Sequence, residues 1–235
     1  MSLAHLARGN RILASLAPDD FERLRPHLER VQFAQNQILY NVGDPIKFVY
    51  FPVCGMISLL STTEDGETVK LAMVGNEGVA GVSVALTIPI APYQMLVEIP
   101  VEALRIDAQA LKTELLLGGK LQDLMMKYIH QILILISQAS VCNRFHTVER
   151  RLSSCLLTAS DCVKSNSLSF TQDTLSRMLG TPRPVVSTAA GILQDLGLIR
   201  YRRGKITILD PGGLETTSCE CYKVVQNVGS VPLNA

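Results

Sequence analysis

The spacing of apolar residues between positions 169 and 210 predicts two short helices followed by a hairpin. Thr171 can cap the first helix and Gly180 ends it. Thr181 can cap the second helix, with Pro182 in its first turn, where a missing N–H costs little. The apolar residues of the first helix share one side: Leu175, Met178 and Leu179.

The second predicted helix has one apolar face and one small, polar face. Its apolar positions recur at helical spacing and predict a buried stripe: Val186, Ala189, Ala190, Leu193 and Leu196. The other positions face outward: Arg183, Pro184, Ser187, Thr188 and Gly191. A helix with this outer face, and with an arginine in its first turn, suits the major groove of double-stranded DNA. Helix pairs also serve as plain packing units, and spacing alone leaves that alternative open.

Charge favours the DNA-binding interpretation. Residues 144–210 hold ten Lys or Arg against five Asp or Glu, a balance of +5, whereas residues 1–143 hold eleven against fourteen, a balance of −3. The overall charge of +1 therefore hides a basic C-terminal part, as expected of a phosphate-binding surface. Its hairpin turn, Arg203-Gly204-Lys205, lies close to Arg200 and Arg202 and is similar to the wing of a winged helix.

Before residue 120, short apolar or alternating runs end in turn residues and predict a small barrel or roll. The runs are Gln37–Tyr40, Phe48–Phe51, Met56–Leu60, Val69–Val74 and Gln94–Ile99. Small helices are expected ahead of them, around Pro18-Asp19-Asp20. A metal enzyme on such a roll needs clustered ligands from its strands, but the only histidines before residue 130 are His5 and His27. With no nucleophile–base set visible either, we do not expect an enzyme.

A long helix is predicted between these two parts. Apolar residues at alternating steps of four and three form a seam typical of helices that pair along their length: Leu121, Met125, Tyr128, Ile132, Leu135, Ala139 and Cys142. We interpret this seam as the interface of a homodimer, which places two recognition helices roughly 34 Å apart on one face of a duplex. The alternative is a helix buried within one chain, supported by further apolar residues: Ile129, Leu133, Ile134 and Ile136.

At 235 residues, with 47% hydrophobic and 18% charged residues, the chain has room for two modest globular domains. The apolar run Ile132–Ile136 is too short to span a bilayer, and no secretory signal is visible, so we expect a cytoplasmic protein without a membrane partner. The cysteines look scattered and are expected to be reduced thiols: Cys54, Cys142, Cys155, Cys162, Cys219 and Cys221.

This order of parts resembles the Crp/Fnr family of bacterial transcription regulators, over about residues 12–215. The most specific segments are His146-Thr147-Val148-Glu149-Arg150-Arg151-Leu152, then Thr171-Gln172-Asp173 through Gly180, and the GLIRYRRGKITILD run. Gly43-Asp44-Pro45 and the Gly75–Gly81 stretch fit the family's sensor roll. The resemblance implies a cytoplasmic homodimer that binds a near-palindromic promoter site and contacts RNA polymerase.

The expected fold class is α+β. An N-terminal cupin-like β-roll, similar to a cyclic-nucleotide-binding domain, with its N-terminal helices takes residues 1–118. The dimerisation helix takes 119–143, a winged helix-turn-helix DNA-binding domain takes 144–218, and a C-terminal tail takes 219–235.

The sensor part departs from family members that bind cyclic AMP. Those carry a Gly-Glu pair for the ribose and an arginine for the cyclic phosphate, but here Glu77 precedes Gly78 and no arginine lies near Pro92-Tyr93-Gln94. Burying an unpaired phosphate against Val, Ile and Pro side chains costs several kcal/mol. We therefore expect a small-molecule effector other than cyclic AMP, or a pocket filled by its own side chains. The candidate pocket residues are Val79, Gly81, Tyr93 and Gln94.

No cofactor and no metal are expected. The Fnr branch of the family holds an iron–sulfur cluster on an N-terminal cysteine group, whereas this chain has only Cys54 before residue 142. Cys219-Glu220-Cys221 is a close pair for which a redox or metal role is conceivable, but two inert thiols are the favoured interpretation. His130 and His146, considered as haem ligands, have ordinary structural explanations.

Within the predicted recognition helix, Arg183 is the best candidate for a bidentate contact to guanine, with Ser187 and Thr188 as secondary readers of bases. Pro184 and Thr188 stand where cyclic-AMP-responsive members have an acidic residue and a second arginine, so their operator sequence does not carry over. The candidate phosphate contacts are Thr171, Gln172, Thr181, Arg203 and Lys205. The alternative function is a ligand- or redox-responsive sensor module whose helix-turn-helix contacts proteins.

Overall fold

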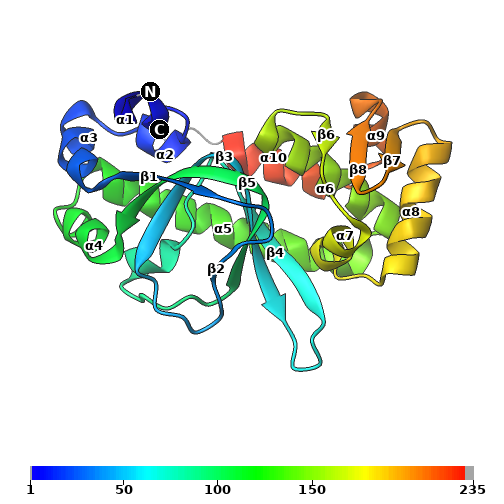
Figure 1. Ribbon diagram of the computed structural model, residues 1–235, viewed down its shortest axis with the longest axis horizontal. Coiled ribbons are helices and arrows are strands. Elements are labelled where there is room, and N and C mark those ends of the chain that lie inside the picture. The colour runs from blue at the N-terminus through cyan, green and yellow to red at the C-terminus, as the bar shows by residue number, and fades with distance from the viewer. Residues whose placement is uncertain (1, 231–235) are drawn as a thin grey trace. The chain divides into compact units, whose positions relative to one another are not determined.

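The computed structural model describes residues 2–230 and divides into two compact units (Figure 1). Residues 2–59 and 73–133 make the N-terminal unit, and residues 60–72 and 134–230 make the C-terminal unit. The helices are α1 (Leu3–Ala7), α2 (Arg11–Ala14), α3 (Pro18–Leu24), η1 (Arg25–His27), η2 (Val82–Leu86), α4 (Ala108–Leu116), α5 (Lys120–Phe145), α6 (Val148–Val163), α7 (Gln172–Leu179), α8 (Arg183–Asp195), α9 (Pro211–Thr217) and α10 (Cys221–Ser230). The strands are β1 (Glu29–Phe33), β2 (Ile38–Tyr40), β3 (Phe48–Thr62), β4 (Thr68–Val74), β5 (Gln94–Asp107), β6 (Ser167–Leu168), β7 (Ile199–Arg202) and β8 (Lys205–Ile208).

The larger sheet confirms the predicted β-roll. Its strands run in the order β1-β5-β3-β4, and β2 also pairs with β5. The apolar runs read from the sequence supply some of the fully buried side chains of this fold, among them Phe51, Met56 and Ile57. Strand β1, antiparallel to β5 with Val31 opposite Ala103, was not predicted, because its exposed charged residues mask the alternation.

Two predicted strand ends are wrong. Pro52 and Gly55 lie inside β3, and Pro100 lies inside β5. A Cβ at Gly55, whose φ is +84°, would lie 2.1 Å from the carbonyl oxygen of Pro100. The residues that interrupt the two neighbouring strands therefore meet at one place, where glycine permits the close approach of the two backbones and each strand continues beyond it.

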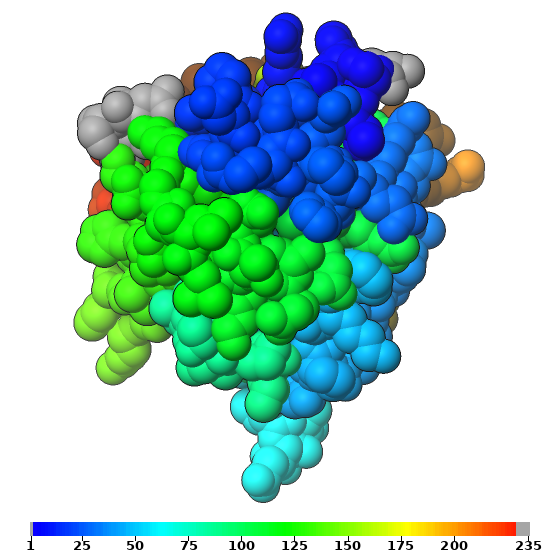
Figure 2. All heavy atoms as spheres, turned by 90° about the vertical axis from the view of Figure 1, so that its left-hand side faces the viewer, coloured from blue at the N-terminus to red at the C-terminus, as the bar shows by residue number. Residues whose placement is uncertain are grey.

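Buried Asn10 joins the N-terminal helices to the roll. Its Oδ1 accepts the N–H groups of Ile12 and Leu13 and so caps α2, while its Nδ2 donates to the carbonyls of Pro52 and Gly78, both at 2.9 Å. Every hydrogen-bonding atom of this amide has a partner, as burial requires. Figure 2 shows the N-terminal helices (blue) lying against the segment that contains α4 (green).

The long helix α5 exists as predicted, but most of its predicted dimer seam is buried inside this chain. Leu121, Met125, Tyr128 and Ile132 are at most 5% exposed, and the Tyr128 ring fills the space above Gly78, where a Cβ would clash at 2.2 Å. Leu135 and Ala139 are partly buried. These seam residues pack within the chain. The first half of α5 is therefore a helix buried in one chain, which was the alternative interpretation.

A second apolar face of α5 remains exposed. Its large exposed side chains are Met126, Leu133, Val141 and Phe145. Ile129 and Ile136 are partly exposed beside them. By length and composition α5 could also cross a membrane, a test that core helices of soluble proteins pass as well.

In the C-terminal unit, α7, α8, α9 and α10 all pack on α6, whose residues 151–159 are buried. A three-stranded sheet of order β6-β8-β7 completes the unit. The prediction of a C-terminal tail from residue 219 is wrong for the residues that the structure describes. Residues 221–230 form α10, which packs against α6. The hydroxyl of Tyr222 in α10 donates to Asp161 Oδ2 at 2.8 Å.

Candidate DNA-binding interface

Helix α7 has the start and the end that its sequence predicts. The Thr171 hydroxyl oxygen accepts the N–H of Thr174 at 3.1 Å and caps the helix. Gly180 ends it with φ +54°, and a Cβ there would lie 2.8 Å from Val69 Cγ2, so both backbone and space favour glycine. The predicted apolar face of α7 is buried.

The predicted cap of α8 is wrong by one residue. Pro182, not Thr181, is the N-cap, and the helix begins at Arg183. The Thr181 hydroxyl instead donates to the Leu179 carbonyl at 3.1 Å. That carbonyl lies at the end of α7, where helix carbonyls lack partners, so Thr181 completes the preceding helix.

Helix α8 buries four of its five predicted core residues: Val186, Ala189, Ala190 and Leu193. The fifth prediction is wrong, because Leu196 follows the last residue of α8 and is 61% exposed. On the opposite face, the Thr188 hydroxyl donates to the Pro184 carbonyl at 3.1 Å, and a Cβ at Gly191 would meet no atom within 4 Å. This outer face carries small side chains and is not covered by other atoms near Gly191. A helix that enters the major groove needs such a face.

Arg151 of α6 fixes the turn between α7 and α8. Its guanidinium is largely buried and donates to the Leu179 carbonyl, to Thr181 Oγ1 at 3.4 Å and to Asn143 Oδ1 at 2.7 Å. Burial lowers the pKa of Arg151. One side chain therefore ties the end of α5 to the turn of the helix pair, an arrangement that spacing along the sequence did not reveal.

The wing is a two-residue hairpin. Arg202 pairs with Lys205 across β7 and β8, and Arg203 and Gly204 have φ of +50° and +74°. Two left-handed residues in succession are typical of the type I′ turn that suits a tight hairpin. A Cβ at Gly204 would lie 3.5 Å from the Thr171 methyl, so the wing turn lies beside the start of α7.

Arg183 forms an ion pair that the sequence did not predict. Its Nε lies 3.0 Å from Asp173 Oδ1 of α7, and both side chains are 58% exposed. Tyr201 of β7 lies close to both: burial raises the pKa of Tyr201, the charge of Arg183 lowers it and that of Asp173 raises it. The starts of α7 and α8 and the strand before the wing turn therefore meet at Arg183. Nothing in the spacing of residues 173 and 183 signals this contact, which depends on the angle between the helices.

In the sensor roll, Glu77 is turned into its own loop. Its Oε1 accepts the Gly75 N–H at 2.8 Å, and burial raises the pKa of its carboxyl. Arg105, the single arginine between residues 75 and 107, lies over the Phe48 ring at 4.3 Å and pairs with Glu29 at 2.7 Å. Both charged groups therefore already have partners within this chain.

The four candidate pocket residues differ in their burial and in the elements to which they belong. Val79 is buried, and Gly81 precedes η2 with φ +96°. Gln94 starts β5 and donates to Asn41 Oδ1 at 3.0 Å, and Tyr93 before it is partly buried. They remain predictions as effector contacts.

Comparison with protein-family models gives two matches. Residues 30–116 match the cyclic nucleotide-binding domain, and residues 150–217 match the Crp-like helix-turn-helix domain. Comparison with curated protein sequences finds no match.

Solved structures have a similar fold. A transcriptional regulator assigned to the Crp/Fnr family from Eubacterium rectale has a TM-score of 0.70 at 18% identity, with 89% of this chain and 98% of that chain covered. FixK2 from Bradyrhizobium japonicum gives 0.70 at 14% identity, covering 82% and 98%. The c-di-GMP-responsive global regulator CLP of Xanthomonas campestris gives 0.66 at 17% identity, covering 82% and 99%.

A sensor roll joined through a long helix to a winged helix-turn-helix defines a DNA-binding transcription regulator. The chain belongs to the Crp/Fnr family of transcription regulators.

Proposed function

We propose that this regulator acts as a homodimer that reads a near-palindromic promoter site through Arg183, Ser187 and Thr188. The observation that carries the proposal is the exposed Arg183 at the first position of α8, beside an open, small outer face. Arg183 supplies the bidentate contact to guanine, a type of contact that discriminates by about 1–3 kcal/mol.

Five residues serve as phosphate contacts in this proposal: Thr171, Gln172, Thr181, Arg203 and Lys205. The proximity of the wing turn to the start of α7 supports them, because Thr171 and Gly204 lie side by side and the exposed side chains of Arg203 and Lys205 flank that point. Thr181 must exchange its hydrogen bond to Leu179 for one to a phosphate oxygen. Such contacts set the register of the protein on DNA and carry little sequence information.

The exposed face of α5 supplies the dimer interface. Met126, Ile129, Leu133 and Ile136 recur at steps of three and four, one position beyond the originally predicted seam, and this heptad spacing suits a partner helix. A second copy of the chain covers this face without requiring a membrane. Two-fold symmetry then presents two copies of α8 to half-sites about one helical turn apart.

The sensor roll is proposed to respond to a small molecule other than cyclic AMP, with Val79, Gly81, Tyr93 and Gln94 as candidate contacts. The inward Glu77 and the engaged Arg105 support the exclusion of cyclic AMP. In the cytoplasm, the bound dimer would contact RNA polymerase, as the family resemblance implies. Within this scheme the roll is a regulatory part rather than an enzyme.

The DNA-binding proposal is tested by selecting bound fragments from random duplex DNA with the purified chain. Arg183→Ala should relax the base preference at one position of each half-site and weaken operator binding about tenfold or more. Arg203→Ala should weaken binding to operator and unrelated duplex alike. Affinity should fall by orders of magnitude between roughly 50 and 200 mM salt if six or more phosphates are contacted. An Arg183→Ala protein with the operator preference of the wild type would refute the assignment, and a chain that binds no duplex at low salt would favour protein contacts instead.

The dimer is tested separately by sedimentation. Leu133→Glu places a charge on the exposed face of α5 and should convert the dimer to a monomer, because two Leu133 side chains each lose about 1.5–3 kcal/mol of burial. The matched control is Gln122→Glu, an exposed position near the start of the same helix. A monomeric wild type, or a dimeric Leu133→Glu variant, would overturn this interface.

A further inference from the structure

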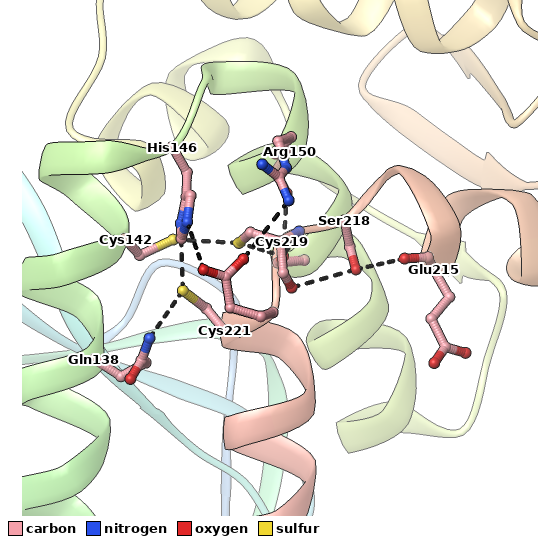
Figure 3. Close-up of polar contacts among 10 residues, drawn as sticks. Gln138, Cys142, His146, Arg150, Glu215, Ser218, Cys219 and Cys221 are labelled. Atoms are coloured by element: carbon pink, nitrogen blue, oxygen red, sulfur yellow. Dashed lines mark hydrogen bonds and ion pairs between the residues drawn. The ribbon is translucent and has the colours of Figure 1, made fainter.

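Three cysteines and a histidine that lie far apart in sequence converge in the C-terminal unit. Cys142 lies in the last turn of α5, His146 directly follows that helix, and Cys219 and Cys221 precede and begin α10 (Figure 3). One ligand atom from each of the four lies within 4.8 Å of the other three. Their positions in the sequence suggested scattered cysteines, but these three cysteines lie together in the structure.

Two distances within this cluster are close to those around a single tetrahedral ion. The Sγ atoms of Cys142 and Cys219 are 3.6 Å apart, and Nδ1 of His146 lies 3.4 Å from Cys221 Sγ. Zinc–sulfur and zinc–nitrogen bonds of about 2.3 and 2.05 Å at tetrahedral angles require S···S and S···N separations of about 3.8 and 3.6 Å. Both observed distances lie within about 0.2 Å of these values, and every other pair of ligand atoms lies within 4.8 Å.

The atoms around the four ligands have the roles expected of partners to a metal site. His146 Nε2 lies 3.1 Å from Glu220 Oε1, so a proton on Nε2 leaves the lone pair of Nδ1 directed at the cysteines. A carboxylate on the far nitrogen of a histidine ligand is a recurrent feature of zinc sites, because it fixes the tautomer. Arg150 holds the other oxygen of Glu220 at 3.6 Å.

One sulfur atom receives a hydrogen bond, and a second lies beside a hydroxyl group. Gln138 Nε2 donates to Cys221 Sγ at 3.1 Å, and the Ser154 hydroxyl lies 3.0 Å from Cys219 Sγ. Donors directed at sulfur favour the thiolate form, which is the form that binds metals.

We propose that Cys142, His146, Cys219 and Cys221 form a structural zinc site that fastens the segment before α10 to the end of α5. Three thiolates with one imidazole in a closed tetrahedral set are a common composition for structural zinc. An iron–sulfur cluster spreads its ligands over two or four iron atoms and needs wider ligand spacing than this cluster offers. The site closes the chain between residues 146 and 219, which carries the entire winged helix-turn-helix, and so stabilises the DNA-binding unit.

The test uses the full, untagged chain purified under reducing conditions. Elemental analysis should find about one zinc per chain, and Cys219→Ser and His146→Ala should each abolish it. His146→Cys should retain the metal, and Glu220→Gln should weaken zinc affinity about 10- to 100-fold in competition with a chelator. Cys54→Ser is the matched control, since Cys54 is exposed and lies in the other unit.

Replacement of zinc by Co²⁺ gives a readout that does not depend on variant folding. The cobalt-loaded wild type should show the visible d–d absorption of a tetrahedral ion together with thiolate-to-cobalt charge transfer, and Cys54→Ser should show the same spectrum. Octahedral cobalt would overturn the proposal. So would zinc that persists in Cys219→Ser and His146→Ala, iron with the absorption of a cluster, or a metal-free chain with a Cys142–Cys219 disulfide. None of these outcomes bears on whether Arg183 reads DNA, so the two proposals fail independently.

Discussion

The ion pair between Arg183 and Asp173 restrains the side chain that we propose reads a base. Replacing Asp173 with Asn removes the carboxylate and keeps the size of the side chain. Because both partners are 58% exposed, the pair stabilises the free conformation of Arg183 by only about 0.2–1 kcal/mol. Releasing Arg183 should therefore tighten operator binding by a factor of about 1.4 to 5.

The measurement is fluorescence anisotropy of a labelled operator duplex at several salt concentrations. Asp195→Asn is the matched control: it removes one exposed carboxylate from the last position of α8, about 18 Å along the helix from Arg183. Asp173 also lies in the first turn of α7, so the Asn variant should lose about 0.3–1 kcal/mol of stability while remaining folded.

A double-mutant cycle separates the ion pair from the general loss of a negative charge near phosphates. In the Arg183→Ala background, Asp173→Asn should retain only the general electrostatic gain, which is common to operator and unrelated DNA. Equal gains in both backgrounds, or weaker operator binding by Asp173→Asn alone, would show that the ion pair does not restrain Arg183.

Three further predictions concern stability and access to the groove. Arg151→Met should lower the free energy of unfolding by about 1–3 kcal/mol in a denaturant titration, because the buried Leu179 carbonyl loses one of its two donors, whereas exposed Arg202→Met should change it by less than about 0.5 kcal/mol. Gly191→Ala should raise thermal stability by about 1 kcal/mol, since the added methyl meets no atom, and Gly191→Gln should leave the protein folded but weaken DNA binding about tenfold or more; normal binding by the Gln variant would place that face outside the groove. Glu77→Gln should raise the melting temperature at pH 7 and not at pH 4. Burial raises the pKa of Glu77 in the folded state, so the folded chain loses stability as the pH rises above the unfolded pKa and the carboxyl ionises. An equal gain in melting temperature at both pH values would contradict this.

The sequence predicts the elements whose signals are local. Thr171 and Gly180 mark the ends of α7 because a cap and a left-handed turn are short-range features. The end predicted for the strand Phe48–Phe51 was wrong for the opposite reason, because Pro52 and Gly55 lie inside β3. Whether they end a strand or bend it depends on Pro100, nearly fifty positions away, and on the contact between their backbones.

The sites were less predictable than the elements. On α5 two apolar stripes lie next to each other, and only the packing of Tyr128 against Gly78 shows which of them the chain buries. Cys142 and His146 carried a signal that could have been used, because ligands four residues apart on a helix share one face. Their meeting with Cys219 and Cys221 depends on how α10 packs on α6, which no local pattern reports.

The convergence of residues 142–146 with residues 219–221 also bears on how such a regulator can be rebuilt. The chain enters and leaves the winged helix-turn-helix at a single point, with sulfur atoms of the two ends 3.6 Å apart. A segment whose ends lie close together tolerates circular permutation, and it can be inserted into another protein with both ends attached at one place. Moving the winged helix-turn-helix from one sensor domain to another then requires a match at one connection point rather than at two.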